Sequence, residues 1–497
     1  MLRRNSIGLF LCIVTSGVAR AADLDTAALD RIIETTRKAW DVPGVAVAIV
    51  HGEDTVYIKG FGVKRAGSSE PVTPDTRFAI CSATKAFTAT ALGILVDEGK
   101  LNWDDPVRKH LPYFKLSDPL ADANVTIRDL LCHRTGLASH DMLWDNSPWS
   151  REEVLRRIGL MPLSRPFRST WQYNNTMFLA AGEVVGHIAG TTWEEFVARR
   201  LLGPLGMSHS DFGKKDPAQS ADYATPHKHV AQEPQPIDWY NLDKIAAAGG
   251  INSTVRDLTR WMRLHLDEGK FEGKVILKEA TIHETHTPQM LLRFARRPIN
   301  EGINFQAYGL GWFMYDYRGH LIINHPGLID GFASMVTLVP DEHYGIAILS
   351  NLGDNDGIIP EMPGVLSRAI VDELLGVTAN DLNPVVLGQR RQAQETAKKQ
   401  REEREAKRRR DTTPSLATTA YAGGYEHVAY GTVQVREDAG KLGLDWSNWQ
   451  LSLEHYVFDS FRVTSPGMLV DNLVQFRLTP SGDVRSVYFL GQEFYRK

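Results

Sequence analysis

The chain reads Phe78-Ala79-Ile80-Cys81-Ser82-Ala83-Thr84-Lys85, which places the hydroxyl of Ser82 and the amine of Lys85 three residues apart. Three residues make nearly one helical turn, so in a helix both side chains rise from the same face. Apolar residues such as Phe87 and Leu95 recur behind this pair at helical spacing, and Gly99 follows them. The pattern predicts a buried helix that carries Ser82 at its N-terminal end.

This pair has a chemical meaning, because a serine hydroxyl is a poor nucleophile until a neighbouring base takes its proton. A neutral lysine one turn away is such a base, but the ordinary lysine pKa is about 10.4 and the site must lower it. By chance alone, a Ser-x-x-Lys pair arises roughly once or twice in a chain of this size, as a surface serine and a solvated lysine. The rest of the sequence has to decide between these interpretations.

Length and composition limit the number of domains and the kinds of partner that the chain can have. A chain of 497 residues exceeds one ordinary domain, so two or three domains are expected. The formal net charge is -4 and the pI is near 6.5, which argues against a nucleic acid or an anionic membrane as partner.

Residues 1–21 predict a secretory signal peptide. Arg3 and Arg4 give a positive start, residues 7–18 are mostly apolar, and Ala19-Arg20-Ala21 fits a cleavage site. A membrane anchor, the alternative, needs a longer apolar run of about 20 residues. We therefore expect a periplasmic or secreted protein with no integral membrane segment after signal removal.

The sequence gives little sign of disulfide, metal or cofactor chemistry. Cys81 and Cys132 remain after the signal peptide, and their apolar surroundings favour buried free thiols, although one disulfide stays open. The run His283-Glu284-Thr285-His286 lacks the spacing of a zinc-binding helix. His227 and His229 lie in a polar loop and are expected to be solvated. We expect no cofactor and no metal.

Strand and helix patterns predict an α/β domain over residues 22–385. Short apolar runs at 45–50, 321–324, 332–339 and 345–349 predict strands, whereas residues 80–270 are mainly helical. Strands near both ends can share one antiparallel sheet flanked by helices, with an all-helical subdomain inserted between them. The cleft between the two parts would be the natural site.

The remainder of the chain predicts a linker and a second, smaller domain. Residues 389–410 are dominated by charged side chains and glutamine, which predicts a solvated helix or a linker, placed at 386–414. Residues 415–497 contain short β-rich runs between Gly, Asp and Asn turns, which predicts a small β-barrel.

Two further polar motifs accompany Ser82 and Lys85. Tyr173-Asn174-Asn175 precedes a helical stretch, so a phenol and an amide lie at a loop-to-helix junction. His325-Pro326-Gly327 lies in a strand-rich segment, where glycine lets a substrate approach the backbone closely. Each motif alone is common in proteins, and a turn with a surface histidine is the alternative for the second.

The three motifs, in this order, resemble the signature of penicillin-binding proteins and serine β-lactamases. Residues 125–137, 204–207 and 248–254 resemble further landmarks of that family. The resemblance covers about residues 25 to 380 and implies a β-lactamase/transpeptidase-like fold of the class C type. It also implies an acyl-enzyme, with Ser82 as nucleophile, Lys85 as its base and Tyr173 relaying or accepting protons. His133 lies in a family landmark and is expected to be structural.

The same resemblance implies the substrate-binding groups. Asn175 would hold the substrate amide or ester group, and the backbone N–H groups of Ser82 and Leu328 would form the oxyanion hole. His325 and Gly327 belong to the third motif, where members that recognise penicillin usually carry Lys-Thr-Gly. A largely neutral histidine and a proline hold a substrate carboxylate less well. The chain therefore resembles the family's esterases, D-aminopeptidases and related peptidases.

The expected function is a serine hydrolase that cleaves amide bonds of peptides, including peptides with D-residues and linear peptides of the non-ribosomal type. An esterase of small acyl esters is the close alternative, and a β-lactamase or DD-peptidase is the third. A penicillin-binding sensor that acylates without turnover is an alternative of a different class. The expected partner is a small-molecule or peptide substrate.

The C-terminal segment resembles a second known module. Tyr421-Ala422-Gly423-Gly424-Tyr425-Glu426-His427 and Leu453-Glu454-His455-Tyr456 are similar to the small lipocalin-like domain appended to some of these hydrolases. In related enzymes such domains close over the cleft or build an oligomer. The resemblance therefore allows a homo-oligomer formed through this domain.

Overall fold

The computed structural model describes residues 24–213, 222–294, 300–354, 361–378, 380–465 and 469–497. The predicted signal peptide, residues 1–21, lies outside the described residues. Within the described ranges, no helix combines the length and the apolar character that a bilayer crossing requires.

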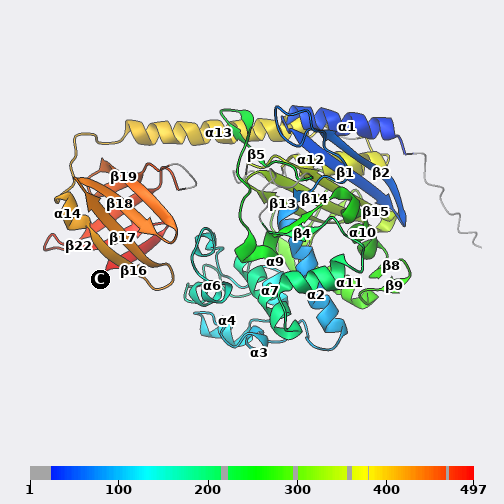
Figure 1. The fold of residues 1–497 in the computed structure, drawn as a ribbon, viewed down its shortest axis with the longest axis horizontal. Coiled ribbons are helices and arrows are strands. Elements are labelled where there is room, and N and C mark those ends of the chain that lie inside the picture. Colours follow the sequence, from blue (N-terminus) through cyan, green and yellow to red (C-terminus); the bar gives the residue numbers. More distant parts are fainter. Residues whose placement is uncertain (1–23, 214–221, 295–299, 355–360, 379, 466–468) are drawn as a thin grey trace, which may run out of the picture.

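An antiparallel sheet of eight strands forms the centre of the larger domain (Figure 1). Its strands, in order, are β10 (Met290–Leu292), β11 (Gln306–Tyr308), β12 (Phe313–Tyr317), β13 (His320–Ile329), β14 (Phe332–Val339), β15 (Tyr344–Ser350), β1 (Gly44–His51) and β2 (Asp54–Gly62). Strand β1 pairs with β15 from Val45 opposite Ser350 to His51 opposite Tyr344. The prediction that strands from both ends of this segment share one antiparallel sheet is confirmed.

Strand β1 is buried on both faces, and its side chains alternate between two cores. Val45 and Val47 belong to one core, whereas Ala46 and Ala48 belong to the other. This period of two is what a strand requires, and it lets helices cover both faces of the sheet. The covering helices are α1 (Thr26–Ala39) and α12 (Met362–Leu374) on the first face and α10 (Val255–Leu266) on the second.

Helix α2 (Thr84–Asp97) runs through the middle of the helical subdomain (Figure 1). Its side chains from Thr84 to Leu95 are all buried, so the helix has no polar face. The helices packed against it are α7 (Asn175–Ala189), α8 (Trp193–Val197), α9 (Ala246–Gly249) and α11 (Glu279–Thr285). As a consequence, the first turn of α2 carries Lys85 into the protein interior.

Helix α13 (Asn383–Ala406) leads from the sheet domain to the C-terminal barrel (Figure 1). Its first turns are docked: Val386 is buried, and Arg390 donates to Glu361 Oε1 at 2.8 Å and to Asp354 Oδ2 at 3.1 Å. The following residues 391–404 are exposed. The charged stretch is therefore the solvated helix that its composition predicts.

The C-terminal segment is a closed barrel of eight antiparallel strands, as predicted. The strands are β16 (Gly423–His427), β17 (Gly431–Asp438), β18 (Lys441–Trp446), β19 (Trp449–Val457), β20 (Ser460–Val463), β21 (Leu473–Leu478), β22 (Val484–Phe489) and β23 (Gln492–Arg496). The β16–β23 pair closes the barrel, so its first and last strands leave no open edge.

The barrel touches the helical subdomain at residues 140–149 and at Arg157, which donates to the backbone oxygen of Ala429 at 2.9 Å. Tyr430 and His140 share a hydrogen bond of 3.0 Å between the phenol and Nδ1. Ser447 Oγ donates to the backbone oxygen of Asn146 at 3.2 Å. Arg408, just after α13, donates to the backbone oxygens of Tyr456 at 2.8 Å and His455 at 3.1 Å, so the barrel is also held where the connecting helix ends.

One prediction about the loops is wrong. His227 is fully buried: its Nε2 accepts from the backbone N–H of Ala66 at 3.0 Å, and its Nδ1 lies 2.9 Å from the backbone oxygen of Asn351. His229 is half-buried and contacts Asp354 through Nδ1 at 2.8 Å. Both histidines lie in the short strand β5 (His227–Val230) and connect it to turns and irregular segments that are distant in the sequence, which the polar character of the local sequence cannot reveal.

The docking of α13 gives a test of how the two domains are joined. Replacing Arg390 by Met leaves the carboxylates of Asp354 and Glu361 without this buried cation, and the free energy of unfolding should fall by about 3 kcal/mol. The matched control is Arg391→Met, because Arg391 is exposed on the same helix. Urea unfolding followed by tryptophan fluorescence compares the two variants. Equal effects of both substitutions would contradict this anchoring.

Candidate active site

Ser82 lies in the tight turn that begins helix α2. The turn is the short 3-10 helix η1 (Cys81–Ala83), in which Cys81 adopts a left-handed φ of 52° that non-glycine residues rarely take. The turn buries Cys81 and Ala83 and leaves Ser82 lining a pocket. Strain of this kind is typical of functional sites. Cys81 and Cys132 are free buried thiols, as predicted.

Lys85 lies directly below Ser82 and is completely buried. Its Nζ is 3.2 Å from Ser82 Oγ, 2.8 Å from Asn175 Oδ1 and 2.9 Å from the backbone oxygen of Ala248. Burial lowers the pKa of Lys85 to about 7, against a weaker opposing effect of the Asp141 carboxylate. A substantial share of this amine is therefore uncharged at neutral pH.

The contacts of Lys85 also fix the direction of its lone pair. The oxygens of Asn175 and Ala248 are pure acceptors, so they take the two N–H groups of the neutral amine. The lone pair is then left for the hydroxyl proton of Ser82. Asn175 keeps its Oδ1 toward Lys85 because its Nδ2 donates to Asp141 Oδ1 at 3.3 Å.

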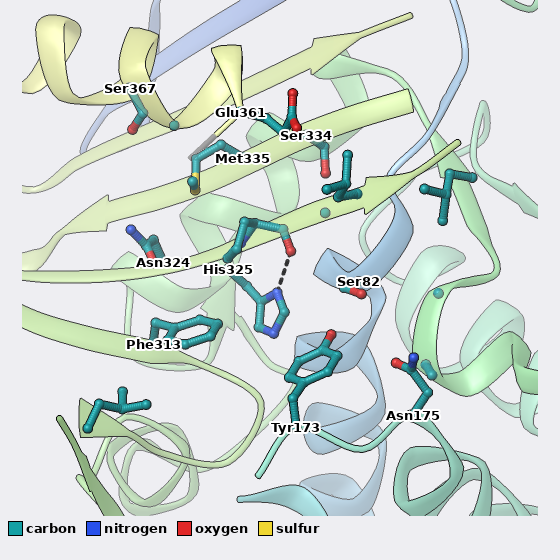
Figure 2. Close-up of a pocket in the computed structure, with 18 of the residues that line it drawn as sticks. Ser82, Tyr173, Asn175, Phe313, Asn324, His325, Ser334, Met335, Glu361 and Ser367 are labelled. Atoms are coloured by element: carbon teal, nitrogen blue, oxygen red, sulfur yellow. Dashed lines mark hydrogen bonds between the residues drawn. The ribbon is translucent and has the colours of Figure 1, made fainter. Parts of the chain in front are cut away.

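Tyr173 completes this group of polar side chains. Its ring centroid is 4.6 Å from Lys85 Nζ. Burial raises the pKa of the Tyr173 phenol, so the neutral form is favoured. Figure 2 shows the Tyr173 hydroxyl and the Asn175 amide turned toward Ser82.

His133 holds the segment that carries Tyr173. Its Nδ1 accepts from the backbone N–H of Asn174 at 3.1 Å, and its ring centroid lies 4.4 Å from that of Tyr173. Asn174 in turn caps helix α7 by accepting from the backbone N–H of Met177 at 3.2 Å. This packing matches the structural role expected for His133.

Strand β13 brings the third motif against the turn that holds Ser82. A Cβ atom at Gly327 would lie 2.1 Å from the backbone oxygen of Ile80 and 2.3 Å from Ser334 Oγ. Ser334 Oγ itself donates to the oxygen of Ile80 at 2.7 Å, which ties β14 to the same turn. Glycine is therefore required at this crossing, and Leu328 follows it along the pocket wall.

His325 lines the pocket, but both of its ring nitrogens are engaged within the protein. Its Nδ1 donates to the backbone oxygen of Pro326 at 2.7 Å (Figure 2). Its Nε2 accepts from the Tyr308 hydroxyl at 3.0 Å. Burial, together with the nearby Lys85, lowers the pKa of His325 to about 3. The ring is thus neutral and offers no positive charge to the pocket.

The pocket has a volume of about 970 Å³ and unites the predicted site residues. It is lined by Ser82, Tyr173, Asn175, His325, Gly327 and Leu328, with Lys85 buried beneath its floor. Sequence reasoning missed one wall, formed by Asp141, Trp144, Asp145 and Tyr240. Asp141 begins the short 3-10 helix η2 (Asp141–Leu143), the other three lie in turns or irregular chain, and no motif in the sequence marks any of them.

A different region could hold a metal ion. The side chains of Glu268, Glu279 and His283 are exposed, and their ligand atoms lie within 4.8 Å of one another. His283 Nε2 is 3.2 Å from Glu268 Oε1, so a direct hydrogen bond already accounts for this proximity. None of the three lines the pocket of Ser82.

The fold and these motifs define a serine hydrolase with the geometry of β-lactamases and penicillin-binding proteins. The chain belongs to the Beta-lactamase family, whose family model matches residues 29–366. Residues 407–495 match a second family, described as a domain of unknown function (DUF3471).

Two curated relatives illustrate the range of similar proteins. Unguisins hydrolase ungD from Aspergillus violaceofuscus is 28% identical over 94% of this chain and 89% of its own length. Protein flp from Staphylococcus aureus is 28% identical over 69% of this chain and 66% of its own length. The first alignment therefore includes the C-terminal segment.

Solved structures agree with this fold. The octameric penicillin-binding protein homologue from Pyrococcus abyssi has a TM-score of 0.60 and 23% identity, covering 95% of this chain and 100% of that chain. D-amino acid amidase from Ochrobactrum anthropi has a TM-score of 0.58 and 24% identity, covering 70% of this chain and 98% of that chain. At this level of identity the likeness concerns the fold.

The close crossing at Gly327 predicts the effect of one methyl group. Gly327→Ala should push β13 away from the turn of Ser82 and slow labelling by a serine-directed fluorophosphonate about 100-fold, as expected for a displacement near 1 Å. Gly388→Ala is the control, because an added Cβ there meets no atom within 4 Å. Labelling of Gly327→Ala at the rate of the unmodified protein would show that the crossing does not position Ser82.

Proposed function

We propose that this protein is a serine peptidase or amidase that forms an acyl-enzyme at Ser82 and cleaves amide bonds of small peptides, including those with D-residues. The observation that carries the proposal is the buried Lys85, whose pKa is lowered to about 7 and whose Nζ lies 3.2 Å from Ser82 Oγ. A base matched to neutral pH and in contact with a serine is the essential part of such an enzyme.

Acylation follows from this geometry. The lone pair of Lys85 takes the hydroxyl proton while Ser82 Oγ attacks the substrate carbonyl carbon, and the carbonyl π electrons move to its oxygen. The backbone N–H groups of Ser82 and Leu328 would stabilise that oxyanion. When the oxyanion collapses, the C–N bond breaks, and the departing amine receives the proton from Lys85 through the Tyr173 hydroxyl.

Deacylation reverses the proton path. A water molecule attacks the ester carbonyl and gives a proton to the Lys85 and Tyr173 pair. The bond from the carbonyl carbon to Ser82 Oγ then breaks, and the serine oxygen regains that proton. The sum is hydrolysis of one amide bond into an acid and an amine, with the enzyme returned unchanged.

Three observations support amides of peptides as the substrate class. The third motif offers no side-chain cation for a substrate carboxylate, since His325 is neutral and internally bonded. The pocket of about 970 Å³ holds a ligand of several residues. A relative aligned over 94% of this chain is named an unguisins hydrolase, and an amidase of D-amino acids shares the fold.

An ester hydrolase remains the second candidate function. The same buried base at Ser82 would serve an ester, and an alkoxide leaving group needs less help from a proton donor than an amine does. Activity on esters alone would therefore require Ser82 and Lys85 but depend little on Tyr173.

A panel of substrates tests the assignment. We expect cleavage of D- or L-aminoacyl anilides or linear peptides, with little turnover of a chromogenic cephalosporin, and loss of all hydrolysis and of fluorophosphonate labelling in Ser82→Ala. Hydrolysis of p-nitrophenyl esters without any amide cleavage would favour the esterase. A single burst without further product would identify a sensor, and labelling of Ser82→Ala would place the nucleophile elsewhere.

The pKa of Lys85 predicts the pH dependence. Because the neutral amine is the base, kcat/KM should rise about tenfold per pH unit in the acidic range and level off above a pH of about 7. The measurement is kcat/KM for one amide between pH 5 and about 9. A profile that still rises steeply above pH 9 would mean that Lys85 keeps an ordinary lysine pKa.

A further inference from the structure

One wall of the pocket gathers three carboxyl groups. Asp141 and Asp145 come from the segment that precedes helix α6 (Arg151–Ile158), Asp330 follows strand β13, and all three line the pocket. Tyr240 lies in the same wall and donates its hydroxyl to Asp145 Oδ1 at 2.8 Å. Burial, and then repulsion from the two other carboxylates, raises the pKa of Asp145.

Asp145 differs from its two neighbours in its partners. Asp330 pairs with Lys228 Nζ at 2.9 Å, and Asp141 accepts from Trp144 Nε1 at 2.7 Å. Asp145 is only 7% exposed, yet its Oδ2 has no hydrogen-bond partner among the residues of the described ranges. An unsatisfied buried carboxylate oxygen is costly and calls for a partner from outside the protein.

That partner should be a cation with several N–H donors. The carboxylates of Asp141 and Asp330 repel an anion, whereas a protonated primary amine supplies both a positive charge and hydrogen bonds. We propose that Asp145, supported by Asp141, Asp330 and Tyr240, binds a primary ammonium group of the substrate. This inference rests on the proposed function and narrows the substrate to amides or peptides that carry a free amino group.

The subsite is held in place by the C-terminal barrel. Asn146, the residue after Asp145, accepts hydrogen bonds through its backbone oxygen from Ser447 Oγ at 3.2 Å and from the backbone N–H of Asn448 at 3.3 Å. The barrel thereby fixes the segment that presents Asp145 to the pocket.

Binding measured without turnover tests the subsite. Calorimetry on full-length Ser82→Ala protein compares phenylalanine amide with N-acetyl-phenylalanine amide, each as D and L forms, and Nα-acetyl-lysine amide with Nα-acetyl-norleucine amide. We expect the member with the free amine to bind about 30-fold more tightly in at least one pair, the usual effect of a buried charge contact. Preference within the first pair identifies the α-amino group as the ligand, and preference within the second pair a basic side chain.

The substitution Asp145→Asn, added to Ser82→Ala, removes the charge but keeps an acceptor for Tyr240. The dissociation constants of the two members of the preferred pair should then differ by no more than about threefold. The ratio of these two dissociation constants does not depend on the fraction of folded protein, because both ligands are measured on the same variant. Asp238→Asn is the matched control, since Asp238 is exposed two residues from Tyr240, and it should keep the original ratio. No preference for the amine in either pair, or a preference that survives Asp145→Asn, overturns the proposal.

Hydrolysis of the same amides by the enzyme with Ser82 intact is measured separately. Amine-dependent binding without amide hydrolysis would keep the ammonium subsite and reject the proposed amidase. Hydrolysis of the amides without amine-dependent binding would keep the proposed amidase and reject the ammonium subsite.

Discussion

The site depends on the burial of one amine. Lys85 lies inside the protein, and among the residues described no carboxylate accepts a hydrogen bond from its Nζ. Burying an ammonium group without a counter-ion has a large free-energy cost, so Lys85 loses its proton near neutral pH instead of near pH 10. Two carbonyl oxygens hold its N–H groups. Asp141 does not bond to it but holds Asn175, and its charge only partly offsets the effect of burial on the Lys85 pKa. The carboxylate thus orients the base without keeping it charged.

The rest of the fold supports this amine from several directions. Helix α2 is buried all round and brings Lys85 into the interior, while the strained turn at Cys81 keeps Ser82 at the pocket surface. Strand β13 reaches that turn only because Gly327 has no side chain. The barrel contacts the segment that carries Asp141 and Asp145, so two domains contribute to the position of the pocket wall. The motif residues alone would not produce this arrangement.

Much of this could be predicted from the sequence, because the relevant signals are local. The helical spacing around Ser82 and Lys85 predicts helix α2. The apolar runs at both ends of the larger domain predict the strands of its sheet, and the β-rich runs after residue 415 predict the barrel. The wall of Asp145 and Tyr240 could not be predicted, since these residues lie in irregular segments and meet only through tertiary packing. His227 was misjudged for the same reason: its partners Ala66 and Asn351 lie far away in the chain. The internal bonding of His325 depends on Tyr308, which no motif connects to it.

The central claim, that burial lowers the pKa of Lys85 to about 7, can be measured directly. In the full-length protein with ¹³C-labelled lysine, the Lys85 Cε resonance is assigned by its absence in Lys85→Met and followed by NMR as a function of pH. We predict a titration midpoint at about 7. A midpoint above about 9.5, close to that of a solvated lysine, would contradict the account.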